Sequence, residues 1–343
     1  MTQEQQDIIN ILEELNIPVI ENDVNYWFIR TNSGDKFQDF YFGNYVAIGW
    51  DKFNNIEHIR NTKQDDLKLE IARAYNEDES RPGSVAAQIK NFVNEIKIND
   101  IVLIPSSNCE RIAFGRITSD AYLYEITDED KMDMAFDDSE IDFLKRRDVE
   151  WITPSPLRRH QIDPLIIPII YSHGAVVSAN NYSNYINRTL FPNYYRNGEF
   201  HSTLRINKKD NVSAYEFNKF LACYFELADI LTDITGETIN KDDLKFKASF
   251  NSPGPVEFIT HAASFFIILS SISLFINGAH VNLELKLSKL FDFKIDIKSD
   301  GLLKKLADIK KTSNEHDEKM KEIESKINDS KDELEIFILY QKF

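Results

Sequence analysis

The feature of the sequence that most restricts its fold is a long run without charge in the last third of the chain. No Lys, Arg, Asp or Glu occurs between Glu257 and Glu284, although 28% of all residues are charged. A helix of about twenty residues is long enough to cross the ~30 Å hydrocarbon core of a bilayer. The pattern therefore predicts a membrane-inserted, transmembrane helix over residues 256–278. The alternative is an apolar helix buried in a protein core, which would also lack charge on every side.

Several small and hydroxyl residues interrupt the apolar run, and they suit close packing between helices in lipid. If several chains assembled, one face of the helix would line a water-filled pore. The candidate membrane and pore residues are Phe258, His261, Phe265, Ile268, Ser271 and Phe275.

A heptad pattern follows near the end of the sequence. Ten positions from Leu302 to Leu334 recur at spacings that alternate between four and three, and charged residues occupy the flanking positions. Seven of the ten are apolar, and Ser313, His316 and Ser330 are polar. The pattern predicts a coiled-coil helix over residues 302–337 that holds a homo-oligomer together. The alternative is one long helix that packs on its own chain. The candidate oligomerisation residues are Leu302, Leu306, Ile309, Met320, Ile323, Ile327 and Leu334.

The rest of the chain has the composition of an α+β globular protein. Hydrophobic residues make up 42% and aromatic residues 12%, which is enough for a sizeable core. A proline cluster marks a boundary near residue 155, and Ser213 and Glu216 form a capping box that opens a helix ending near Ile234. We expect an amphipathic helix over residues 1–19, a β-rich domain over 20–155 and an α+β coupling domain over 156–250.

The formal net charge is −16, and nearly all of the excess lies in the first half of the chain. Residues 1–155 contain 16 Lys and Arg against 31 Asp and Glu, a difference of −15. Non-specific binding to duplex DNA needs a broad surface of Lys and Arg. Any nucleic-acid site in this half must therefore be a local pocket.

Nothing in the sequence predicts an enzyme or a bound metal. The seven histidines are scattered, and no HExxH, GxSxG or Walker glycine loop is present. The acidic segment Asp128–Asp142 lacks the ligand spacing of a calcium loop. A nuclease, one alternative, has no supporting PD…(D/E)xK pattern. We therefore expect no catalytic residue and no cofactor.

Aromatic residues gather on two candidate strands, YWFIR and YVAIGW, which we expect to be neighbours. Trp27 lies on the first strand, and Trp50 ends the second. Aromatic rings bind bases by stacking, whatever the base, and a nearby Arg neutralises a phosphate. The pattern favours a nucleic-acid pocket that contains both rings. The alternative is that each tryptophan belongs to the core of a small barrel.

These strands begin a longer resemblance to a known family. The order YWFIRTNSG, VAIGW and QIKNFVNEIKINDIVLIPSS resembles an EVE-like domain of the PUA superfamily over residues 20–150. The family's K-x-G-D-x-V motif corresponds to Lys97–Val102, with Asn99 in place of the glycine. The resemblance implies a β-barrel whose aromatic pocket binds modified bases or short nucleic acids. The nucleic-acid-binding residues that it implies are Trp27, Arg30, Thr31, Asn32, Trp50, Arg81, Gln88, Ser106, Ser107 and Arg111.

The architecture as a whole resembles the transmembrane effectors of the Hailong anti-phage defence systems. In that family an EVE-like domain binds a short single-stranded DNA oligomer, made by a partner nucleotidyltransferase, and the oligomer keeps a membrane ion channel closed. Loss of the oligomer opens the channel and harms the infected cell. The resemblance implies a homo-oligomer, expected to be a tetramer, in the bacterial inner membrane, with its sensor domain in the cytoplasm and its helix in contact with membrane lipid. The alternative is a soluble EVE-like reader of modified or single-stranded nucleic acid in a restriction or defence system.

Overall fold

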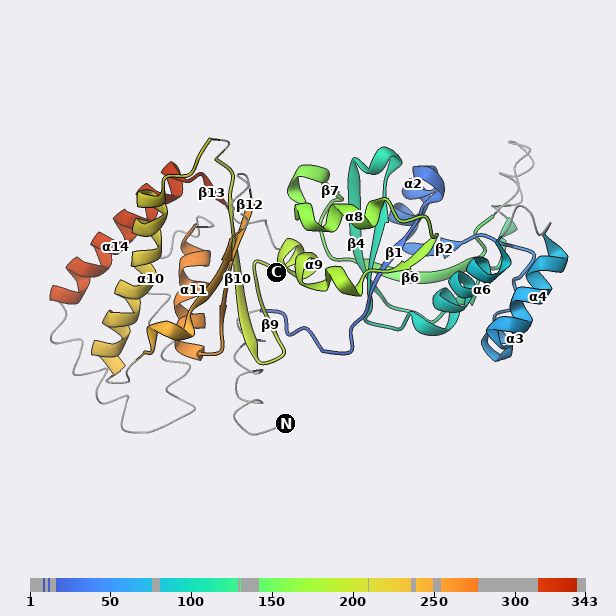
Figure 1. Ribbon diagram of the computed structural model, residues 1–343, viewed down its shortest axis with the longest axis horizontal. Helices are drawn as coiled ribbons and strands as arrows, with labels where there is room; N and C mark the ends of the chain where they lie inside the picture. The colour runs from blue at the N-terminus through green and yellow to red at the C-terminus, as the bar shows by residue number, and fades with distance from the viewer. Residues whose placement is uncertain are drawn as a thin grey trace. The chain divides into compact units, whose positions relative to one another are not determined.

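The chain folds into two units, and each contains both helices and strands. The computed structural model describes residues 9, 12, 17–75, 81–128, 130, 142–208, 210–235, 239–248, 254–276 and 314–337. Contacts divide the chain into unit 1, residues 1–22 and 187–341, and unit 2, residues 23–186 (Figure 1). Unit 2 extends past the expected boundary near residue 155, because β7 (Leu157–Arg158) and β8 (Val176–Ser178) pair with its sheet.

The described part of unit 2 is built on an eight-stranded sheet that forms half a barrel. Its strands are β1 (Tyr26–Ile29), β2 (Tyr45–Ile48), β3 (Ile101–Pro105), β4 (Arg111–Ile117), β5 (Tyr122–Leu123), β6 (Lys145–Trp151), β7 and β8. The order is β2-β6-β4-β3-β1-β8, with β5 beside β6 and β7 beside β4. β1 and β3 run parallel, whereas β3 and β4 are antiparallel, as are β1 and β8. The carboxyl ends of β1 and β3 therefore meet at one edge, and the loops that follow them come together.

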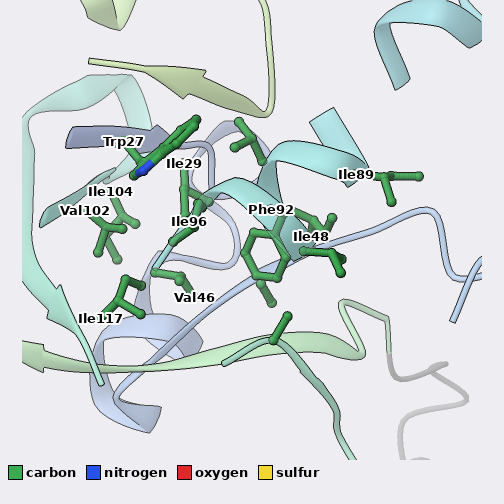
Figure 2. Packing of buried hydrophobic residues seen from close by; sticks show 14 of the residues in the cluster. Trp27, Ile29, Val46, Ile48, Ile89, Phe92, Ile96, Val102, Ile104 and Ile117 are labelled. Carbon is green, nitrogen blue, oxygen red and sulfur yellow. The ribbon is translucent and has the colours of Figure 1, made fainter. Parts of the chain in front are cut away.

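Helices cover the sheet of unit 2 and supply half of its core. They are α2 (Phe37–Gly43), α3 (Ile56–Asn61), α4 (Gln64–Ala74), α6 (Pro82–Lys90) and α8 (Ile167–Ile170), with short 3-10 turns η1 (Asn32–Gly34), η3 (Ser107–Cys109), η4 (Arg159–Gln161), η5 (Pro164–Ile166) and η6 (Asn180–Tyr182). The next helix, α9 (Ser183–Leu190), crosses the boundary between the units, because Asn187 and the residues after it belong to unit 1. α6 continues into a π-helical turn, η2 (Asn91–Glu95). Ile89, Phe92 and Ile96 of this segment are buried in one cluster with strand residues such as Val46 and Val102 (Figure 2).

The described strands of unit 1 form an antiparallel sheet with helices packed on one face (Figure 1). The strands are β9 (Asn193–Arg196), β10 (Glu199–Ile206), β11 (Lys245–Ala248), β12 (Gly254–Thr260) and β13 (Ile336–Phe337), in the order β11-β12-β10-β13 with β9 beside β10. The helices are α10 (Ala214–Thr235), α11 (Ala263–Ile276) and α14 (Asn314–Glu333), with a short turn η7 (Lys241–Asp243). Leu204 and Phe258 from the sheet share a buried core with Tyr224 and Phe265 from the helices.

Local sequence signals place two helical segments of unit 1. α10 starts directly after Ser213, whose hydroxyl accepts the backbone N–H of Glu216 at 3.4 Å, so the predicted helix start is confirmed. In the segment over residues 1–19, Ile9 and Leu12 are helical. Leu12 is buried beside Phe200, in keeping with an apolar helix face that packs on the sheet.

The charge-free run does not form the predicted transmembrane helix. Its first residues belong to strand β12, and the helix that follows, α11, has 14 residues. Among the described residues, no helix is both long and apolar enough to span a membrane. As far as Ile276, where the described part of the run ends, charge is absent because a buried strand and a buried helix, joined by a short turn, both contribute to the core of unit 1. The prediction of a membrane-spanning helix over residues 256–278 is therefore wrong, and the fold is α+β.

The four predicted pore residues whose side chains are described do not form a pore-lining face. Phe258, Phe265 and Ile268 are fully buried in the core of unit 1. His261 is exposed, and its Nε2 lies 3.3 Å from Glu199 Oε1. The side chains of the two remaining residues, Ser271 and Phe275, lie outside the described part of the chain.

The last four residues of the predicted heptad seam also lie inside unit 1. Met320, Ile323, Ile327 and Leu334 are buried in its core, and α14 packs along α10. An ion pair between Lys326 Nζ and Glu226 Oε2, 3.0 Å apart, joins the same two helices. For this part of the seam the coiled-coil prediction is wrong, and the alternative of a helix packed on its own chain describes it. Leu302, Leu306 and Ile309 lie outside the described residues.

Candidate nucleic-acid interface

The loops that follow the parallel strands β1 and β3 press against each other at one edge of unit 2. A Cβ atom on Gly34 would lie 2.2 Å from the backbone nitrogen of Ser107, so this approach requires glycine. Thr31 Oγ1 donates to the carbonyl oxygen of Pro105 at 2.5 Å and ties the two strand ends together. Asn32 and Asn108 adopt positive φ angles of 50° and 52°. Non-glycine residues in this region of φ are uncommon and often occur at functional sites.

Three exposed arginines stand beside these loops and are called the arginine edge: Arg111, Arg158 and Arg159. Arg111 in β4 and Arg158 in β7 are direct partners across an antiparallel pair, so their side chains leave the same face. Arg159 follows, and its backbone N–H donates to the carbonyl oxygen of Glu110 at 3.0 Å. Within the described part of the chain, no carboxylate forms an ion pair with any of the three.

This arrangement is electrostatically unfavourable without a partner. Like charges directly opposite each other destabilise a strand pair. The positive charge at this edge also acts on the thiol of Cys109. Burial raises the pKa of this thiol, whereas the nearby charges of Arg30 and Arg159 lower it. The arginine edge therefore has the chemistry of an anion site in a strongly acidic chain.

An exposed aromatic ring adjoins the arginine edge. Tyr171 is 65% exposed, and its hydroxyl accepts a hydrogen bond from Arg159 Nη2 at 3.2 Å. Arg30 holds the turn that carries this tyrosine: its Nε donates to the carbonyl oxygen of Ser172 and its Nη2 to that of Ile170, both at 3.0 Å. The guanidinium of Arg30 thus fixes the backbone on both sides of Tyr171.

The other predicted polar residues divide between this edge and purely structural positions. Ser106 Oγ accepts the backbone N–H of Arg111 at 2.9 Å, which fixes the first residue of β4. Gln88 Oε1 accepts the backbone N–H groups of Ala175 and Val176, so it holds the start of β8. Arg81 is exposed at the start of α6, with a positive φ of 40°. The predicted residues brought together at the edge are Arg30, Thr31, Asn32, Ser106, Ser107 and Arg111.

The two tryptophans do not share a pocket. Trp27 is only 6% exposed, and its Nε1 donates to Asp100 Oδ2 at 2.9 Å. Figure 2 shows its ring beside Ile29 in the buried cluster. The strand before Trp50, β2, is separated from β1 by β6, β4 and β3, so the expectation of neighbouring strands is wrong. For Trp27, the alternative of a core residue describes the structure.

Trp50 is half-buried, and its backbone is held by a buried lysine. Lys145 Nζ donates to the carbonyl oxygen of Trp50 at 3.1 Å and to Asn54 Oδ1 at 2.8 Å. Burial lowers the pKa of Lys145 to about 8, although the charge of Asp51 opposes this shift. This lysine fixes the loop after β2.

A family comparison covers the same unit. Residues 27–165 match the sequence model of a domain of unknown function, DUF8426. No curated protein and no solved structure is significantly similar to the chain. The matched residues lie within unit 2 and include the arginine edge.

Sequence reasoning missed three residues of this interface. Arg158, Arg159 and Tyr171 follow the region that resembles an EVE-like domain, so the resemblance did not include them. The signal was present in the consecutive arginines of SPLRRH, which follow a proline cluster in a chain of net charge −16.

A second polar cluster was also missed, and it lies in unit 1. His201 Nδ1 is 2.9 Å from Glu257 Oε1, the Tyr194 hydroxyl donates to the same oxygen at 3.1 Å, and Arg188 Nη1 is 3.6 Å from Glu257 Oε2. Burial alone would raise the pKa of Glu257. The hydrogen bond and charge of His201, the charge of Arg188 and the hydrogen bond from Tyr194 hold this pKa below its ordinary value. Polar residues at alternate positions of β10 were the available signal.

Proposed function

We propose that unit 2 binds short single-stranded nucleic acid at the arginine edge. The observation that carries this proposal is the direct opposition of Arg111 and Arg158, two exposed arginines that pair with no described carboxylate. A phosphate group between them would remove the repulsion and accept hydrogen bonds from both guanidinium groups. Phosphate contacts of this kind supply most of the sequence-independent affinity of nucleic-acid-binding proteins.

A single strand fits this edge better than a duplex does. The net charge of −16 repels a long polyanion, whereas a local group of arginines attracts a few phosphates. Tyr171 adds an exposed ring beside Arg159, and an unpaired base can stack on such a ring. Bases in a duplex are already stacked and do not offer their faces.

The proposal keeps the predicted nucleic-acid ligand and leaves out the predicted ion channel. The predicted transmembrane helix over residues 256–278 is not part of the proposal, because the described residues of this stretch belong to β12 and α11. A role in anti-phage defence, a partner nucleotidyltransferase and a tetramer stay predictions of the family resemblance.

We expect the Arg158→Glu change to weaken the binding of a short single-stranded oligonucleotide by roughly tenfold or more, because it removes a phosphate contact and adds repulsion. Fluorescence anisotropy with labelled ten-nucleotide DNA and RNA at two salt concentrations measures this effect. The matched control is Arg73→Glu, the same charge change at an exposed position of α4. The proposal fails if the unmodified protein shows no saturable binding, or if both variants lose affinity equally.

We expect Tyr171→Ala to weaken the same binding by about 1–3 kcal/mol, because a stacked base would lose its ring. Tyr171→Phe keeps the ring and should retain nearly all of the affinity. Phe42→Ala is the control, since Phe42 is 75% exposed on α2. Equal affinities for the Ala variant and the unmodified protein would exclude stacking at this position while leaving the phosphate contacts intact.

A further inference from the structure

A second candidate site lies at the other end of β3. An open hollow of about 620 Å³ forms around the loop that precedes this strand, whereas the arginine edge lies near the loop that follows it. Its lining includes Arg60 at the end of α3, Lys97 and Ile98 before β3, Asp120 after β4, and Arg147 in β6. The volume is that of an ordinary small-molecule site, which measures about 300–1,000 Å³.

Positive charge predominates in this hollow. Arg60, Lys97 and Arg147 face a single lining carboxylate, that of Asp120. Arg147 is buried, and its guanidinium donates to the carbonyl oxygens of Phe92, Ser119 and Val93 at 2.8, 3.0 and 3.1 Å. Arg147 therefore forms a fixed cationic floor.

The charged groups around Arg147 also affect its pKa. Burial lowers the pKa of Arg147 to about 10; the charges of Asp120 and Asp100 oppose this shift, and the charge of Arg60 adds to it. Arg60 and Lys97 are exposed, and among the described residues no carboxylate forms an ion pair with either, so both side chains can contact an added anion.

The rim of the hollow is preorganised. Asp100, which is buried, accepts the backbone N–H of Lys97 and the indole N–H of Trp27, each at 2.9 Å, and so fixes the loop that carries Ile98. Ile98 is 51% exposed on this loop, beside the cations. The neighbouring segment η2 is a π-helical turn, a feature that is frequent at functional sites. The side chain of Ile98 can contact a flat apolar group, while Arg60 and Lys97 beside it can bind an anionic group. The hollow therefore suits a ligand that has both parts.

We propose that this hollow binds a mononucleotide. Arg60 and Lys97 hold the phosphate, the face of the base covers Ile98, and the Asp120 carboxylate accepts hydrogen bonds from the ribose hydroxyls. Each group of the ligand then meets a side chain of matching chemistry. This site uses none of the residues of the arginine edge. The proposal is therefore independent of the proposed binding of oligonucleotides, and the two can be tested separately.

Isothermal titration of the full-length protein with the four ribonucleoside monophosphates, with adenosine and with inorganic phosphate tests the proposal. At least one monophosphate should bind with a Kd of about 1 mM or tighter. Adenosine and inorganic phosphate should each bind at least about tenfold more weakly, because each lacks one half of the ligand. Arg60→Ala, Lys97→Ala and Ile98→Ser, all at exposed positions, should each weaken binding several-fold.

Arg158→Ala is the control that separates the two sites, and it should leave monophosphate binding unchanged. The proposal is overturned if no monophosphate binds, or if inorganic phosphate alone binds as tightly, since the hollow would then take only an anion. It is also overturned if Arg158→Ala abolishes binding while the Arg60 and Lys97 variants retain it. That result would place the nucleotide at the arginine edge.

Discussion

Replacing Trp27 with alanine is expected to lower the free energy of unfolding of unit 2 by about 3–5 kcal/mol. The indole is 6% exposed and packs in the main cluster of the unit with Ile29 and Val102. Its removal leaves a cavity and takes one hydrogen-bond donor from the buried carboxylate of Asp100. Urea unfolding followed by circular dichroism measures the loss.

Two further variants separate the possible roles of this ring. Trp27→Phe restores most of the apolar volume without the N–H group, so it should cost less than the alanine change and isolate the hydrogen bond to Asp100. Trp50→Ala should cost less than Trp27→Ala, since Trp50 is only half-buried. A Trp27→Ala protein of unchanged stability that no longer bound oligonucleotides would show that the ring belongs to the ligand site and contradict its assignment to the core.

Glu257→Gln is expected to destabilise unit 1 by about 3 kcal/mol, because removing one partner from a buried ion pair leaves the other charges uncompensated. The carboxylate is buried between His201, Arg188 and the Tyr194 hydroxyl. Glutamine preserves the shape and one acceptor oxygen but removes the negative charge. The measurement is the urea unfolding of full-length protein near neutral pH.

The same carboxylate predicts an acid-sensitive component of stability. Its pKa in the folded protein is below the ordinary value of 4.5. Its contribution to stability is therefore fully present above pH 4.5 and is lost as the pH falls through the lower, folded value. The Glu257→Gln variant should lose less stability than the unmodified protein over this range. Glu226→Gln is the control, because Glu226 forms a surface pair with Lys326 that contributes about 1 kcal/mol or less.

Local signals in the sequence predicted much of the secondary structure. The β-rich segments around Trp27 and Val46 are strands, and the capping box at Ser213 opens α10. These features depend on neighbouring residues, such as alternation along a strand or a hydroxyl group three residues before an N–H group. A single sequence contains all the information that they require.

The charge-free run led to a wrong prediction of a transmembrane helix because a lipid bilayer and a protein core select the same residue types. A lipid bilayer and a protein core both exclude charged side chains, so the absence of charge from Phe258 to Leu283 fits either one. Only the pairing of β12 with β10 and β11 distinguishes them. The heptad pattern was ambiguous for the same reason. An apolar stripe on α14 can pack against α10 of the same chain as well as against a second copy of the protein.

The candidate site was only partly predictable for a related reason. Arg111 was found through the family resemblance, but its partner Arg158 was not, because strand pairing between distant segments is not encoded in local periodicity. The same limit explains Trp27 and Trp50. β1, which carries Trp27, and β2, which ends two residues before Trp50, were expected to be neighbours but have three strands between them in the sheet order.

The parallel pairing of β1 with β3 also affects how the protein folds. Tyr26 pairs with Ile101, and Trp27 pairs on its other side with Ser178, so the central strands join segments from the start, middle and end of unit 2. Contacts between such distant residues form late and slow the folding of a domain. The loops beside the arginine edge cannot meet until β3 has been synthesised and paired. A chain shortened before β8 would expose one side of β1, and a nascent chain that has not reached Ser178 would be a substrate for aggregation or chaperones.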